Sequence, residues 1–163
     1  MNKQILPSIV AVAVLVAGIW LLSSSSKPMP EVTFNLVDGS TLKSGDLRGK
    51  SVLVNFWSVT CEVCLRDMPA LGRLQESMKD QGLVVIGVAV PHDPPPAVIS
   101  TVKELNPAYA IALDVHGEVS KAFGDIKVTP TNFLIDPRGN INFSQRGPLN
   151  EPGVRATLLT FQR

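Results

Sequence analysis

The sequence contains 163 residues, of which 45% are hydrophobic and 18% are charged, and its formal net charge is +1. Two of the 15 basic residues, Lys3 and Lys27, precede residue 31, which leaves 13 basic beside 14 acidic residues in the rest of the chain. A nearly neutral domain lacks the basic surface that binds nucleic acid, so we expect no nucleic-acid partner.

The first 22 residues form an apolar segment. No charge occurs in residues 5–22, and only Gly18 interrupts the apolar run of residues 9–22. This length is at the short end of what spans a bilayer and is longer than a usual signal-peptide core. Residues 23–26 offer no Ala-x-Ala cleavage site, which favours an uncleaved single-pass anchor over a cleaved signal segment. With Lys3 on the inner side, the rest of the chain would face outward.

Two further regions follow this segment. Residues 23–30 are rich in serine and proline and are interpreted as a linker. Residues 31–163 are long enough for one domain with its own core and short for two.

The domain begins with a predicted β-hairpin. Residues 32–36 alternate in polarity, Asp38-Gly39 is a strong signal for a two-residue turn, and residues 40–42 form the returning arm. Residues 51–56 are a nearly continuous apolar run rich in β-branched side chains, which predicts a strand covered on both faces.

A helix is predicted after this strand, and we expect Pro69 to kink or interrupt it. Its apolar positions recur at helical spacing and are Leu65, Met68, Leu71, Leu74 and Met78. Residues 83–90 form a second buried-strand run. The order strand, helix, strand makes the two strands parallel with a right-handed crossover.

The second half of the domain is predicted to contain short elements. We expect Asn150 to cap the last helix, and Pro137 and Gly139 to form the turn of a second hairpin. The expected helices cover residues 97–105, 117–123 and 151–162, and the expected strands cover residues 110–113, 131–135 and 141–145.

The only two cysteines, Cys61 and Cys64, lie where the first buried strand gives way to the helix. A helix N-terminus favours a thiolate over a thiol. Zinc would need further ligands, and His92 and His116 are widely separated, so we expect surface or capping roles for them. A structural disulfide this short would remove little entropy from the unfolded chain. We interpret the pair as a redox-active dithiol, with zinc and a structural disulfide as the alternatives.

As a set, the motifs of residues 31–163 resemble the thioredoxin superfamily, specifically the membrane-anchored extracytoplasmic thiol-disulfide oxidoreductases of the TlpA, ResA and CcmG type. The motifs are Val54-Asn55-Phe56-Trp57, Cys61-Glu62-Val63-Cys64, Met68-Pro69 and Thr129-Pro130-Thr131. The resemblance implies an α/β fold of three α/β/α layers around a central mixed β-sheet, with an N-terminal β-hairpin and a central helix-strand insertion.

The resemblance also implies roles for individual residues. Cys61 matches the exposed nucleophile and Cys64 the buried resolving cysteine. Trp57 matches the aromatic residue that shields the site. Pro130 matches a cis-proline facing the dithiol, and Thr129 the residue whose backbone pairs with a bound substrate strand.

Three residues depart from the pattern or modify it. Thr60 stands where many relatives have tryptophan, which makes the surface around the thiol smaller and more polar. Asn55 stands where thioredoxin has a buried aspartate, so that proton acceptor is missing. Glu62 suits the helix dipole, yet its charge would oppose a Cys61 thiolate; we hypothesise that it keeps the pair reducing.

The implied function is reduction of protein disulfides in cytochrome c or copper-site maturation. No cofactor or metal is expected beyond the Cys61–Cys64 disulfide, and a membrane thiol transporter would supply electrons. The expected location is the bacterial inner membrane, as a monomer facing the periplasm or extracytoplasmic side.

Two other functions remain possible. A peroxiredoxin-like peroxidase would need a proline where Val54 stands, although Ser58 lies at a suitable distance before Cys61. A copper-binding maturation module could use both cysteines and Met68, because thiolate and thioether ligands select Cu(I).

Overall fold

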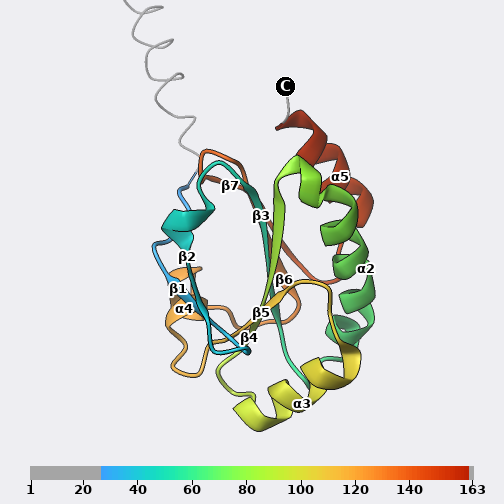
Figure 1. The fold of residues 1–163 in the computed structure, drawn as a ribbon. Coiled ribbons are helices and arrows are strands. Elements are labelled where there is room, and N and C mark those ends of the chain that lie inside the picture. Colours follow the sequence, from blue (N-terminus) through green and yellow to red (C-terminus); the bar gives the residue numbers. More distant parts are fainter. Residues whose placement is uncertain (1–26, 162–163) are drawn as a thin grey trace, which may run out of the picture.

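The structure, a computed structural model, describes residues 27–161, and these residues form one seven-stranded mixed sheet in the order β2-β1-β5-β4-β3-β6-β7 (Figure 1). The expected anchor of residues 1–22 lies outside the described residues. The strands are β1 (Thr33–Leu36), β2 (Thr41–Lys43), β3 (Ser51–Trp57), β4 (Leu83–Ala89), β5 (Ala110–Leu113), β6 (Thr131–Ile135) and β7 (Ile141–Arg146).

The centre of the sheet is the predicted strand, helix, strand unit. Strand β3 pairs in parallel with β4 along its whole length, from Ser51 opposite Leu83 to Trp57 opposite Ala89. All seven residues of β3 are buried, as its apolar run predicted. Strand β5 adds in parallel to β4, whereas β6 pairs antiparallel with β3. The mixed sheet is therefore confirmed.

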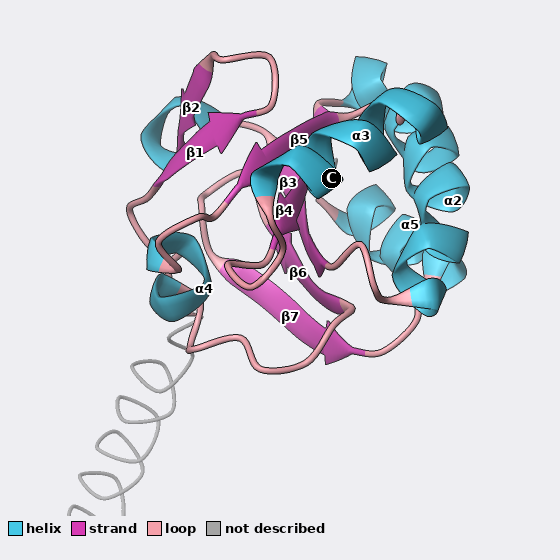
Figure 2. Ribbon diagram, turned by 90° about the horizontal axis from the view of Figure 1, so that it is seen from below, coloured by secondary structure: helices cyan, strands magenta, loops and turns pink. Residues whose placement is uncertain are grey.

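Helices cover both faces of this sheet, which confirms the three-layer α/β/α prediction (Figure 2). Helices α2, α3 and α5 lie on one face, and the short α4 lies on the other. Their bounds are α2 (Glu62–Met78), α3 (Pro95–Leu105), α4 (Glu118–Ala122) and α5 (Glu151–Thr160). The inserted α3 and β5 are the expected helix-strand insertion.

The two faces of the sheet have different cores. On the face of α4, Phe56, Phe123 and Phe133 contact one another edge to face, with ring centroids 5.0–5.9 Å apart. On the opposite face, Leu53 and Leu134 pack with apolar residues of α2 and α5. Alternation along β3 and β6 directs successive side chains to the two cores, because neighbouring residues of a strand point to opposite faces.

The N-terminal hairpin is confirmed, but the expected two-residue turn is wrong. Thr41 pairs with Asn35, and the Leu36 amide donates to the Ser40 carbonyl oxygen (2.8 Å). Three residues, 37–39, therefore form the turn. Gly39 has a φ of +86°, a left-handed conformation that suits the last residue of a three-residue hairpin turn.

Of the two effects expected from Pro69, a kink or an interruption, the interruption is wrong, because α2 continues through Pro69 from Glu62 to Met78. Proline removes one intrahelical donor, that of its own nitrogen. Met68, Leu71 and Leu74 are buried on both sides of Pro69, and this packing outweighs the local cost of the proline.

Several element ends differ from the sequence expectation. Helix α3 begins at Pro95, two residues before the expected start, because proline is tolerated in the first helical turn, where amides need no intrahelical partner. Helix α5 ends at Thr160, whereas the expected end at Gln162 lies outside the described residues. Asn150 caps α5 as predicted, and its side-chain oxygen accepts from the Gly153 amide (3.2 Å).

Part of the expected linker pairs with the domain. The Lys27 carbonyl oxygen accepts from the Ile141 amide (2.8 Å), and the Met29 amide donates to the Gly139 carbonyl oxygen (2.9 Å). Residues 27–29 therefore form a short extended contact beside the turn between β6 and β7.

Candidate functional site

Cys61 and Cys64 lie where β3 ends and α2 begins, and they form a disulfide in the structure. Cys61 is the N-cap of α2, in an extended conformation, and its Sγ accepts a hydrogen bond from the Cys64 amide (3.2 Å). The first turn of a helix has amides without intrahelical partners, and one of these is directed at the Cys61 sulfur. The predicted position of the dithiol is thus confirmed.

The two sulfurs differ in their access to solvent. Cys61 is partly exposed, whereas Cys64 is 1% exposed and packs with Trp57, Met68 and Val98. The amide hydrogen bond and the helix dipole stabilise negative charge on Cys61, while burial disfavours it on Cys64. After reduction, this arrangement would leave one accessible sulfur at the helix N-terminus and one sheltered sulfur behind it.

Trp57, the last residue of β3, is completely buried beside Cys64. Its indole Nε1 has no hydrogen-bond partner. Trp57 therefore covers the inner side of the dithiol as part of the core, and it does not shield the outer side of Cys61.

Glu62 extends into solvent, since its side chain is 92% exposed. Its Oε1 lies 3.8 Å from Nη1 of Arg66, one turn along α2. Solvent and the Arg66 guanidinium both screen the Glu62 carboxylate, so its effect on Cys61 is expected to be small.

Asn55 is buried in β3 and pairs with Asn132 of β6. Asn55 Nδ2 donates to Asn132 Oδ1 (2.8 Å), and Asn132 Nδ2 donates to the Gly147 carbonyl oxygen (3.2 Å). Asn55 lies on the same strand face as Leu53 and Trp57, toward α2. A neutral amide pair thus occupies this position, and the sequence did not identify Asn132 as a member of it.

The Thr129–Pro130 peptide is cis, as the resemblance implied. Pro130 directly precedes Thr131, which pairs with Phe56 on the neighbouring β3. The cis peptide therefore lies at the same end of the sheet as Trp57 and the dithiol. Thr129 is partly exposed, whereas Pro130 is buried.

A buried carboxylate that the sequence did not single out adjoins the segment before the dithiol. Asp93 follows β4 and is 6% exposed. Its Oδ1 accepts from the Ser58 hydroxyl (2.8 Å), and its Oδ2 accepts from the Val59 amide (2.8 Å). Because the carboxyl ends of adjacent parallel strands lie at one edge of a sheet, an acidic residue after β4 was the available signal.

A second acidic residue near the dithiol is Asp67, one turn after Cys64 on α2. Its Oδ2 accepts from the Leu149 amide (2.8 Å). Burial, and to a smaller extent the Asp67 charge, raise the pKa of Tyr109 well above its ordinary value, and the Tyr109 hydroxyl has no partner. Tyr109 therefore remains neutral at physiological pH.

The two histidines have the surface positions expected for them. His116 is exposed, and the His92 side chain is 69% exposed, with Nε2 3.9 Å from Asp93 Oδ1. Within residues 27–161, no group of three or more histidine, cysteine, aspartate and glutamate side chains could hold a metal ion. Met68 is buried beside Cys64 and Trp57.

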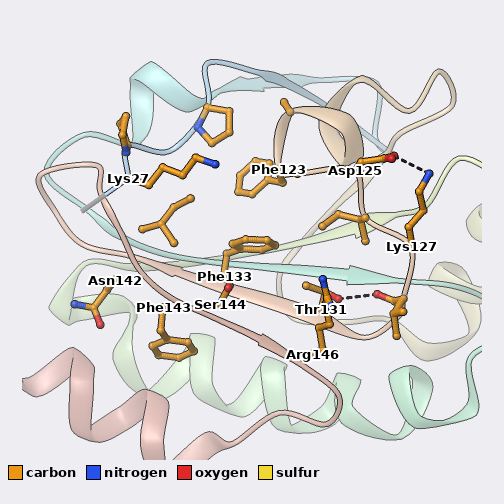
Figure 3. Close-up of a pocket in the computed structure, with 17 residues that line it drawn as sticks. Lys27, Phe123, Asp125, Lys127, Thr131, Phe133, Asn142, Phe143, Ser144 and Arg146 are labelled. Atoms are coloured by element: carbon orange, nitrogen blue, oxygen red, sulfur yellow. Dashed lines mark hydrogen bonds and ion pairs between the residues drawn. The ribbon is translucent and has the colours of Figure 1, made fainter. Parts of the chain in front are cut away.

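A cleft of about 680 Å³ lies on the sheet face of α4, between residues 122–128 and β7 (Figure 3). Phe123 and Phe133 line it, and Lys27, Lys127 and Arg146 surround it with positive charge. Lys127 is paired with Asp125 (2.9 Å). Neither cysteine lines this cleft, so it is separate from the dithiol.

Across the described part of the chain, no helix has both the length and the apolar character needed to cross a bilayer.

The chain is similar in sequence to known thiol-disulfide oxidoreductases. The thiol-disulfide oxidoreductase ResA of Bacillus thuringiensis subsp. konkukian is 31% identical over 115 residues, which are 71% of this chain and 65% of that protein. ResA of Bacillus subtilis is 29% identical over 128 residues, covering 78% of this chain and 70% of the relative. The chain thus matches less than two thirds of the length of the first of these relatives.

A solved structure and a family model agree with this similarity. A thiol:disulfide interchange protein of the thioredoxin family from Chlorobium tepidum is 26% identical, with a TM-score of 0.77 over 86% of this chain and 99% of that one. The model of the Redoxin family matches residues 24–158. The resemblance to TlpA, ResA and CcmG proteins is therefore confirmed, and the chain belongs to the Redoxin family.

Proposed function

We propose that this protein is a thiol-disulfide oxidoreductase that reduces disulfides in other proteins through Cys61 and Cys64. The observation that carries the proposal is the asymmetry of the pair. Cys61 is partly exposed and accepts an amide hydrogen bond at a helix N-terminus, whereas Cys64 is 1% exposed behind it. This is the arrangement that stepwise thiol-disulfide exchange requires.

The exchange proceeds in two displacements. The Cys61 thiolate attacks one sulfur of the substrate disulfide, forms a mixed disulfide and releases one substrate thiolate, which takes up a proton. Cys64 then loses its proton, attacks the Cys61 sulfur and breaks the mixed disulfide, and the second substrate sulfur leaves as a thiolate that takes up a proton. Two electrons pass from the dithiol to the substrate, and the Cys61–Cys64 disulfide is the product that must be reduced again.

Supporting residues would act on the two sides of this pair. Trp57 and the buried Asn55 keep the inner side closed to water. Thr129 and cis-Pro130 lie at the same end of the sheet, where the Thr129 backbone would pair with an extended segment of the substrate. Strand-like pairing of this kind orients a peptide without requiring a particular side chain.

The sequence pattern and the resemblance to membrane-anchored thiol-disulfide oxidoreductases support a location and a pathway for this activity. The apolar residues 5–22 favour a protein anchored in the bacterial inner membrane, with the domain on the outer side. Because the chain has no further cysteines, electrons must come from another protein, which we assign to a membrane thiol transporter. Substrates would be disulfides of apocytochrome c or of copper-site proteins, and the protein would act as a monomer.

Trapping of the mixed disulfide tests this function. In Cys64→Ser, Cys61 can attack a substrate, but the mixed disulfide cannot be resolved, so partner proteins should stay attached through a reducible bond. The matched control, Cys61→Ser, keeps one cysteine but should trap nothing. Partners from cytochrome or copper-site maturation would identify the pathway. Equal trapping by both variants, or by neither, would contradict the proposal.

Peroxide consumption separates the peroxidase alternative. The wild-type protein and a dithiol donor should consume hydrogen peroxide no faster than the Cys61→Ser variant with the same donor. In this structure the Ser58 hydroxyl donates to Asp93, so it does not face Cys61 as a free activating group. Anaerobic purification followed by copper analysis separates the copper-binding alternative.

A further inference from the structure

Between β3 and the dithiol, three successive backbone amides, those of Val59, Thr60 and Cys61, donate within one small hydrogen-bond network. The Val59 amide donates to Asp93 Oδ2 (2.8 Å), and the Thr60 amide donates to Ser58 Oγ (3.2 Å). The Cys61 amide donates to the Ser58 carbonyl oxygen (3.1 Å). Of these three successive amides, two are held by the Asp93 and Ser58 side chains and the third by the Ser58 backbone carbonyl.

Asp93 is the outer anchor of this network. One carboxylate oxygen accepts from the Ser58 hydroxyl and the other from the Val59 amide, both at 2.8 Å. Hydrogen bonds to an ionised, buried acceptor are roughly twice as strong as neutral ones. The exposed His92 side chain lies beside this carboxylate, with Nε2 3.9 Å from Asp93 Oδ1.

The anchor itself is held by the sheet. The Val90 amide donates to the Trp57 carbonyl oxygen (3.1 Å), and the Asp93 amide donates to the Val90 carbonyl oxygen (3.1 Å). Pro94, the next residue, is the N-cap of α3. Asp93 therefore joins the segment after β3 to the segment after β4, independently of the disulfide.

This independence matters during the reaction, because the S–S bond opens and closes in each cycle. Once the bond is broken, the segment before Cys61 must still hold that residue at the N-cap, where the Cys64 amide is 3.2 Å from the sulfur. Stabilisation by a helix N-terminus falls off within the first turn, so a small displacement of Cys61 reduces it.

We propose that Asp93 is a positioning residue for the thiol chemistry, which acts through Ser58 and Val59 to keep Cys61 at the N-terminus of α2 in the reduced protein. The inference rests on the proposed function only in assuming that Cys61 is the attacking thiol. Ionisation of Cys61 can be measured without any substrate, so failure of one does not imply failure of the other.

Two other roles for Asp93 make different predictions. If its negative charge acted mainly through space, the pKa of Cys61 would fall when the charge was removed, because a nearby anion opposes a thiolate. If Asp93 were only structural, stability would fall and the pKa of Cys61 would not change. Positioning predicts that the pKa of Cys61 rises.

The test uses the reduced full-length chain in detergent and measures the rate of Cys61 alkylation against pH. Asp93→Asn should raise the pKa of Cys61 and lower the alkylation rate at pH 7 about threefold or more, the change produced by half a pKa unit. The matched control is Asp114→Asn. Asp114 is another buried aspartate, 5% exposed, which accepts from the Val119 and Ser120 amides (3.0 and 2.7 Å).

Ser58→Ala distinguishes an effect on the position of Cys61 from an effect of the Asp93 charge. It removes the Ser58 hydroxyl from the network and leaves the Asp93 carboxylate in place. It should raise the pKa of Cys61 in the same direction by a smaller amount, and it decides the question alone if Asp93→Asn does not fold. A fall in the pKa of Cys61 in Asp93→Asn would overturn the proposal. So would a value unchanged relative to Asp114→Asn, or an unchanged value in Ser58→Ala.

Discussion

Two loops at the carboxyl end of the sheet are built alike and differ in what they hold. After β4, Asp93 accepts from Ser58 and Val59, in the segment before the dithiol. After β5, Asp114 accepts from the Val119 and Ser120 amides in the first turn of α4. Both carboxylates are almost completely buried.

The difference between the two loops separates a contact that affects thiol reactivity from one that affects only the stability of the fold. Both use a carboxylate to satisfy amides that would otherwise be buried without partners. Only the Asp93 loop binds a segment that leads directly to an accessible sulfur, that of Cys61 at the start of the long helix α2. A short helix such as α4, with five residues, has no comparable group at its start. The comparison predicts that changes near the dithiol alter reactivity, whereas changes near α4 alter stability alone.

The largest effect is expected from removal of the Cys61 sulfur. Cys61→Ser should lower the rate of disulfide reduction at least a thousandfold, about 4 kcal/mol in the activation barrier, because a hydroxyl does not replace a thiolate nucleophile. The measurement is reduction of a model protein disulfide by the chemically reduced chain.

The control for that change is Cys64→Ser, which should keep the first attack and lose resolution. If Cys61→Ser reduced the model protein disulfide as fast as the wild-type protein, Cys61 would not be the nucleophile. It would also remove the functional difference between the two loops.

Loss of Asp114 should destabilise the fold without affecting exchange. Asp114→Ala leaves two buried amides without partners and should cost about 2–4 kcal/mol of unfolding free energy. Urea unfolding measures this cost, and the rate of Cys61 alkylation should stay within about twofold of wild type, a margin well inside ordinary context effects. A large change in that rate would break the distinction between the loops.

Tyr109 provides a pH-dependent test, because it is the only tyrosine in the chain. Burial and the Asp67 charge raise its pKa in the folded state. Its contribution to stability is complete below the ordinary tyrosine pKa of about 10 and is lost as the pH rises above that value.

The absorbance of the phenolate should therefore appear only at higher pH than for free tyrosine, or on unfolding. Tyr109→Phe removes a buried hydroxyl without a partner and should stabilise by up to about 1 kcal/mol at neutral pH, with less alkaline destabilisation. Titration of the folded wild-type protein near pH 10 would contradict the burial of Tyr109.

The smallest effect is expected at Glu62. Glu62→Gln should lower the pKa of Cys61 by about a few tenths of a unit, since an exposed and screened charge opposes the thiolate only weakly. The control is Glu76→Gln, an exposed glutamate near the other end of α2 that pairs with Lys79 (2.7 Å). An unchanged or raised pKa in Glu62→Gln would disprove the hypothesis that Glu62 keeps the pair reducing.

The sequence predicted those features that depend on local pattern. The buried runs of β3 and β4, the helix spacing after Cys61 and the cap at Asn150 are all local signals, and each is confirmed. The cis peptide before Pro130 was predicted from resemblance and not from pattern.

The sequence could not predict contacts between segments that are distant in the chain. Asp93 lies 35 residues from Ser58, and Asn132 lies 77 residues from Asn55. Such pairs depend on the order of strands in the sheet. The continuity of α2 through Pro69 was missed for a related reason, since tertiary packing on both sides of the proline outweighs its local preference.

The central claim is that Cys61 and Cys64 are chemically unequal, and the most direct measurement is alkylation of each cysteine in the reduced protein across a range of pH, resolved by mass spectrometry. The account predicts that Cys61 reacts with a pKa below the ordinary thiol value of about 8.5, while Cys64 stays protected until the chain unfolds. Equal reactivity, or faster modification of Cys64, would contradict it.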